Sequence, residues 1–352
     1  MLHLKIKYEF KLVLVFSFAL LLLYAVDKYF TKIEIRKDCA QMSEAISLTE
    51  RWFNDVGQMK KEKKISNDIR SDTKYNFLIG DEYTNITTTF GSLEAKELSA
   101  NPEFAALLIK YLTNSNIDST KTVGIILSGS FPSLSISCLA AIQTLNSKAI
   151  IFSSLGASMF GANQPGATWL DIENYLIKSS NLKYKSSLVT VGAEDDNGGG
   201  LSDDGFQILK TTASNYNVSL YYPPSLKESI EKKVEILLGG EIDILINIGG
   251  NQTSLGSCAH SSNIPNGFHR EYKSCNHENR GIIARLSERE IPFINLLNIK
   301  SLAIENQISL DPTVVSGGLI FSNRKTEKIP IALSIIASFG LILLIRKKKN
   351  YE

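Results

Sequence analysis

The chain has 352 residues, a formal net charge of +2 and a hydrophobic fraction of 43%. This length is enough for one large or two small domains, and the small charge excludes the strongly basic balance that is typical of nucleic-acid-binding proteins. Four cysteines permit disulfide bonds if the main part of the chain lies in an oxidising compartment.

Two apolar segments, residues 12–26 and 329–345, lie near the two ends of the chain and predict transmembrane helices. Each is slightly shorter than the roughly 20 apolar residues that cross an average bilayer. A cleaved signal peptide is the alternative for the first segment, because a basic start and a short apolar core are both present. Residues 24–27 offer no small-x-small cleavage site, so we expect the segment to stay as an anchor.

Basic residues flank both apolar segments on the side of the chain end. Three lysines lie within residues 1–11, and residues 346–352 form a basic tail. Because basic flanks stay on the cytoplasmic side of a membrane, both termini are expected to be cytoplasmic. The sequence therefore predicts a two-pass protein of the cell membrane whose main domain is extracytoplasmic.

The outer part divides into a helical neck and linker, residues 27–91, and an α/β domain, residues 92–328. Residues 39–64 carry apolar side chains at helical spacing, which predicts a helix that packs on the domain or on a partner. The lysine-rich run at residues 60–64 is interpreted as the solvated face of that helix.

Within residues 92–328, short apolar runs alternate with helical patterns, which is typical of a parallel sheet covered on both faces. We expect an α/β fold with a doubly wound, mostly parallel sheet. The predicted strands are 123–127, 149–152, 188–191, 219–221, 242–248 and 293–297. The predicted helices between them are 133–145, 169–178, 205–216, 226–238 and 280–289.

Ligands bind such folds where the strands end, because the loops there point backbone N–H groups into a shared crevice. The loop after the first strand offers hydroxyls around a glycine, although it lacks the lysine of a P-loop and simple helix capping is the alternative. The loop after the strand at 242–248 is the richest in polar side chains. The ligand-binding candidates are therefore Ser128, Gly129, Ser130, Asn251, Gln252, Thr253 and Ser254.

The loop after the third strand places Glu194, Asp195 and Asp196 among glycines. Carboxylate oxygens are suitable ligands for Ca²⁺ or Mg²⁺, so these residues are the candidates for a divalent cation site, although their spacing does not match an EF-hand. No other cofactor is indicated.

Cys258 and Cys275 bound a loop rich in glycine, serine and asparagine that has little apolar content to hold it. We predict a disulfide between them. His260 and His269 lie within or beside this loop as possible bases or metal ligands, but no HExxH pattern accompanies them.

The arrangement of anchor, neck, outward α/β domain and second anchor, together with three loops, resembles the poly-gamma-glutamate system protein family over nearly the full length. The loops read SGSFPS at 128–133, EDDNGGG at 194–200 and GGNQTSLG at 249–256. The resemblance implies an accessory role beside the synthetase components that make, export or attach this anionic capsule polymer. It implies a membrane and those components as partners and the polymer as a ligand, and it supplies no catalytic residue. The small net charge implies no nucleic-acid partner.

Two alternatives stay open. The first is an envelope hydrolase or transferase that acts on amide bonds, with the Ser128/Ser130 loop and the loop at 251–254 converging on one cleft. A triad of Ser130, a histidine and an aspartate would serve it, although the GxSxG motif is absent. The second is a scaffold without catalytic activity, in which these loops are only turns.

Overall fold

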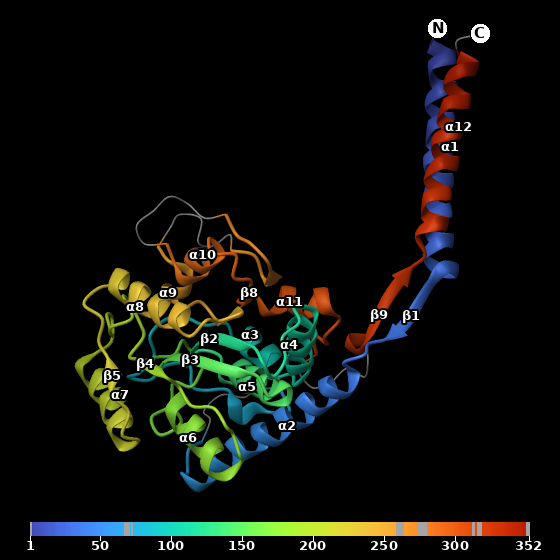
Figure 1. Cartoon of the computed structure of the whole chain (residues 1–352). Helices are drawn as coiled ribbons and strands as arrows, with labels where there is room; N and C mark the ends of the chain where they lie inside the picture. Colours follow the sequence, from blue (N-terminus) through green and yellow to red (C-terminus); the bar gives the residue numbers. More distant parts are fainter. Residues whose placement is uncertain are drawn as a thin grey trace. The chain divides into compact units, whose positions relative to one another are not determined.

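The computed structural model (Figure 1) describes residues 2–66, 71, 73–257, 264–273, 280–311, 314 and 319–349. The chain divides into two compact units. The first unit, called the body here, is Asp38–Ile320, and the second combines Met1–Lys37 with Phe321–Glu352. Cys258, Cys275 and His260 lie outside the described residues, so their pairing and role stay predictions.

A seven-stranded sheet in the order β5-β4-β3-β2-β6-β8-β7 forms the centre of the body. Neighbouring strands are parallel, except that the edge strand β7 runs antiparallel to β8. This confirms the predicted α/β fold with a mostly parallel sheet. The strands are β2 Thr122–Ser128, β3 Lys148–Ser154, β4 Leu188–Thr190, β5 Leu220–Tyr221, β6 Ile244–Ile248, β7 Gly267–His269 and β8 Phe293–Leu296.

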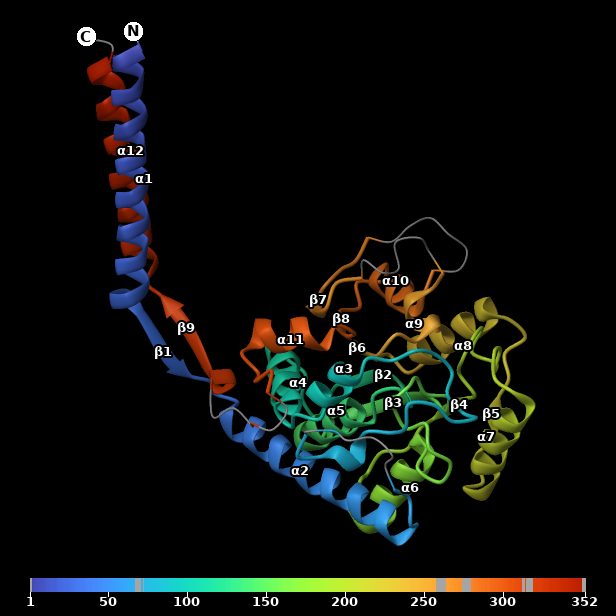
Figure 2. The same cartoon turned by 180° about the vertical axis from the view of Figure 1, so that it is seen from behind.

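Helices cover both faces of this sheet (Figures 1 and 2). Apolar side chains of α8 and α10 pack with those of β2, β3, β6 and β8 on one face, while α2 contacts α4, α5 and α6 on the other. The body helices are α2 Cys39–Glu62, α3 Leu93–Ser99, α4 Glu103–Asn114, α5 Pro132–Leu145, α6 Trp169–Ser179, α7 Asp203–Asn215, α8 Leu226–Gly239, α9 Gln252–Leu255, α10 Ile282–Ser287 and α11 Ile299–Asn306.

Local sequence signals set the ends of these helices. Thr168 and Asp171 form a capping box that starts α6, because each side chain accepts a hydrogen bond from the other's backbone N–H. Pro132 occupies the first turn of α5, where its missing N–H costs nothing, and Asn146 ends that helix in the left-handed conformation. The predicted helices at 133–145 and 169–178 are confirmed as α5 and α6, because these local signals set their ends.

The helix expected as a neck belongs to the body. Trp52 and Phe53 of α2 are fully buried, and the Trp52 Nε1 donates a hydrogen bond to the Ser180 carbonyl at 3.0 Å. Lys60 is also buried, and its Nζ donates to Gln164 Oε1 at 2.7 Å. The interpretation of 60–64 as a solvated face is therefore wrong for Lys60, since its side chain turns into the body to reach an amide partner.

The second unit is a pair of helices extended by a pair of strands. The helices α1, Leu2–Phe30, and α12, Lys328–Lys349, lie side by side (Figures 1 and 2), and β1, Thr31–Ile35, pairs antiparallel with β9, Ser322–Thr326. One stretch of α1, Val13–Phe30, is long and apolar enough to cross a membrane, whereas the apolar stretch of α12 is shorter.

Candidate functional site

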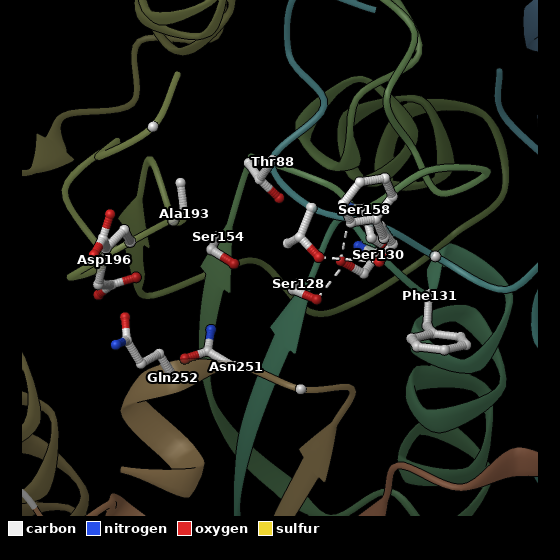
Figure 3. Close-up of a pocket in the computed structure, with 18 of the residues that line it drawn as sticks. Thr88, Ser128, Ser130, Phe131, Ser154, Ser158, Ala193, Asp196, Asn251 and Gln252 are labelled. Carbon is white, nitrogen blue, oxygen red and sulfur yellow. Dashed lines mark hydrogen bonds between the residues drawn. The ribbon is translucent and has the colours of Figure 1, made fainter. Parts of the chain in front are cut away.

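The order of the strands creates a topological switch point between β2 and β6. From β2 the chain moves outward through β3, β4 and β5, and it then returns to β6, from which it runs to the edge strand β7 and back to β8 on the other side. The loops after β2 and β6 therefore separate at the carboxyl edge of the sheet, which is where ligands bind in this class of fold. A cavity of about 620 Å³ opens there (Figure 3).

Four of the seven predicted ligand-binding residues line this cavity: Ser128, Ser130, Asn251 and Gln252. The two predicted loops therefore converge, as Figure 3 shows.

The other three predicted residues serve the structure around the cavity. Thr253 and Ser254 are fully buried. A Cβ on Gly129 would lie 2.9 Å from the Leu155 carbonyl oxygen, so a larger residue does not fit there.

Hydrogen bonds fix the two loops. Ser128 Oγ accepts from the Ser130 N–H at 3.3 Å, and Ser130 Oγ accepts from the Ser158 N–H at 3.0 Å. Asn251 Oδ1 accepts from the Thr253 N–H at 2.9 Å and thus caps α9, while Gln252 Oε1 accepts from the Asp195 N–H at 2.9 Å. Part of the polar lining is therefore used to hold its own loops in place.

Lys96 is a buried lysine at the cavity that the sequence pattern does not predict as a site residue. It lies on α3, is only 2% exposed, and its Nζ donates to Ser158 Oγ at 2.9 Å and to the Ser130 carbonyl. The Nζ also lies 3.5 Å from the centre of the Phe131 ring. Burial lowers the pKa of Lys96 to about 7, because desolvation disfavours the ammonium form. In a sequence, a single lysine on a short amphipathic helix indicates a solvent-facing side chain.

An extended segment before α3 brings this lysine to the cavity. The Thr88 N–H donates to the Ala157 carbonyl at 2.8 Å, and the Met159 N–H donates to the Thr89 carbonyl at 3.0 Å. Gly91 lies so close to this partner segment that a Cβ on it would be 2.4 Å from the Met159 carbonyl oxygen. The segment therefore packs directly beside Ser158.

The arrangement of the acidic loop does not support the predicted cation site. Both oxygens of the buried Asp196 carboxylate have partners: Thr190 at 2.7 Å, Ser229 at 2.6 Å and the Lys233 Nζ at 2.6 Å. Glu194 and Asp195 are exposed. Over the described part of the chain, no group of three or more His, Cys, Asp and Glu side chains is arranged to hold a metal ion. Asp196 is drawn into a buried ion pair while Glu194 and Asp195 are exposed, so the cation site at these three residues stays a prediction that this arrangement does not support.

His269 is not placed to act as the base of a catalytic triad with Ser130. This histidine lies on β7, its Nε2 is 2.8 Å from the Asn266 carbonyl oxygen, and its ring packs against Phe293. It does not line the cavity that holds Ser130.

Comparison with known proteins adds no assignment to this site. No protein-family model matches the chain, and neither curated proteins nor solved structures give a significant match.

Proposed function

We propose that this chain is a two-pass membrane protein with an extracytoplasmic body, and that it assists the synthesis, export or attachment of poly-gamma-glutamate. In this proposal the cavity at the carboxyl edge of the sheet binds a segment of the polymer. The partners are the synthetase components in the same membrane.

Exposed apolar side chains support the membrane part of the proposal. Leu20 on α1 and Ile336 on α12 are 68% and 67% exposed, and both helices carry further exposed leucine and phenylalanine side chains. Large apolar side chains on a pair of helices that lack other cover are stable in lipid. The basic residues at the chain-end side of each helix support a cytoplasmic location of both termini.

The side chains that line the cavity are the observation that supports binding of the polymer. The polar side chains of the cavity include the hydroxyls of Ser128, Ser130 and Ser154, the amides of Asn251 and Gln252, the amine of Lys96, and the carboxylates of Glu194 and Asp196, of which Asp196 is paired with Lys233. Each repeat of poly-gamma-glutamate presents one amide and one carboxylate. Hydroxyl and amide groups hydrogen-bond to both of these groups, and the fraction of Lys96 that stays protonated at a pKa of about 7 attracts the carboxylate.

Gly250 offers a way to test this binding. It lines the cavity and is exposed, and a Cβ on it would meet only Leu297, at an ordinary distance of 3.6 Å. Gly250→Glu therefore adds a negative side chain to the cavity without a clash. Gly239→Glu is the matched control, because this residue ends α8 at the opposite edge of the sheet and has no atom within 4 Å of its Cβ position.

The experiment uses a strain that keeps the synthetase components but lacks this chain. We expect surface poly-gamma-glutamate to fall, to be restored by the wild type and by Gly239→Glu, and to stay low with Gly250→Glu at equal protein level. Purified Gly250→Glu should bind the polymer at least about tenfold more weakly, because its carboxylate repels an anionic chain. Unchanged polymer amount, length and attachment after the deletion would reject the proposed function.

A second candidate function is an envelope hydrolase or transferase that acts on amide bonds. It is favoured by the convergence of the Ser128/Ser130 loop with Asn251 and Gln252 on one cavity.

A further inference from the structure

We infer that Ser158 and Lys96 form a serine–lysine catalytic pair, in which Ser158 is the nucleophile and Lys96 the general base for acyl transfer or hydrolysis at an amide carbonyl. This inference extends the second candidate function and does not depend on the assignment of poly-gamma-glutamate. Neither residue was among the sites predicted from the sequence.

The geometry brings the two groups together inside the cavity. The distance from Lys96 Nζ to Ser158 Oγ is 2.9 Å, which is within the range needed for direct proton transfer. Both residues line the cavity, and both are almost fully buried, at 2% and 7% exposure. The Ser158 backbone is held by Ser130 Oγ, so the hydroxyl is presented from a fixed position.

The environment of Lys96 suits a base. A lysine with its ordinary pKa is protonated at neutral pH and has no lone pair to accept a proton. Burial lowers the pKa of Lys96 to about 7, so the neutral amine is well populated. A neutral amine with two hydrogens keeps its donation to the Ser130 carbonyl and directs its lone pair to the Ser158 hydroxyl.

The chemistry balances with these two groups and water. Ser158 Oγ attacks the carbonyl carbon as its proton moves to Lys96 Nζ, and a tetrahedral intermediate forms. The C–N bond then breaks, the amine leaves with the proton from Lys96, and an ester to Ser158 is left. Water, or the amine of another molecule, attacks this ester while Lys96 takes its proton, and that proton returns to Ser158 Oγ as the acid or the new amide departs.

The lining indicates the class of substrate. A cavity of about 620 Å³ accommodates a small molecule or a short chain segment. Serine hydroxyls and the Gln252 amide match the amide groups of a peptide-like chain, and Phe131 and Leu297 offer apolar surface for its methylene groups.

The test uses the full chain in detergent and a fluorophosphonate, which phosphonylates activated serines and loses fluoride. We expect one adduct, mapped by mass spectrometry to Ser158, and none in Ser158→Ala. Lys96→Met should slow labelling by about 100-fold or more, the usual contribution of a general base. Lys232→Met, at an exposed lysine paired with Glu235, is the matched control and should label like the wild type.

The dependence on pH tests the base without any substitution that could affect folding. The wild-type labelling rate should rise between about pH 5.5 and about pH 8.5, with a midpoint near 7, because only the neutral amine accepts the proton. No adduct on Ser158, an equal rate in Lys96→Met, or a rate independent of pH would each overturn the inference. Polymer binding by Ser158→Ala, measured in parallel, separates a failure of this chemistry from a failure of the polymer proposal.

Discussion

Two buried lysines of the body are stabilised in different ways. Lys233 pairs with the Asp196 carboxylate, and both side chains are 2% exposed. Lys96 instead lies among hydroxyl and carbonyl oxygens beside the Phe131 ring, where burial dominates and lowers its pKa. The first arrangement is an ion pair that fixes a loop, while the second makes the neutral amine of Lys96 accessible near neutral pH.

The buried pair yields a stability prediction. Lys233→Met leaves the Asp196 carboxylate buried without its cation, so the free energy of unfolding should fall by about 3–5 kcal/mol in urea denaturation. Lys232→Met on the same helix removes only a solvent-exposed pair and should change it by about 1 kcal/mol or less.

A double variant shows whether the unpaired Asp196 charge causes the loss of stability in Lys233→Met. Adding Asp196→Asn to Lys233→Met removes the unpaired charge and keeps a residue that tolerates the positive φ of 62° at this position, so most of the loss should be recovered. An equal loss in the single and double variants would contradict this account.

At the scale of elements, α2 is a structural helix of the body. Trp52→Ala should lower the free energy of unfolding of the body by about 3–5 kcal/mol, because it leaves a large cavity against α6 and removes the hydrogen bond to Ser180. Arg51→Ala, at the exposed neighbouring position, should stay within about 0.5 kcal/mol. Equal effects in chemical denaturation would mean that α2 is a separate neck.

The elements also show what a sequence alone reveals. The apolar runs of β2, β3 and β6 and the caps of α5 and α6 are local signals, so these elements could be predicted. The edge strand Gly267–His269 and the pairing of β1 with β9 depend on partners far along the chain, and the local pattern does not contain them.

The difference between local signals and long-range contacts also explains which residues of the candidate site could be predicted. Ser128, Ser130, Asn251 and Gln252 could be predicted because they directly follow strands. Lys96 could not, because a helix outside the strand–helix alternation delivers it to the cavity.

At the scale of the whole molecule, the predicted topology is open to a direct test. Tyr83→Cys places a thiol at a position of the body that is 73% exposed. A membrane-impermeant maleimide should label it, above the level of the parent chain, in cells whose cytoplasmic membrane is intact. Lys347→Cys in the basic end of the chain should react only after permeabilisation. The reverse pattern would place the body in the cytoplasm.

The pairing of β1 with β9 makes the body an insertion into a hairpin. The Arg36 N–H donates to the Phe321 carbonyl at 2.9 Å. The body begins at Asp38, two residues after Arg36, and ends at Ile320, directly before Phe321, so both of its ends lie beside this paired position. A protease that cuts one body loop therefore leaves both fragments attached to the helix pair. Release of the body from the helix pair requires one cut in each of the two connections, so it is a two-cut event.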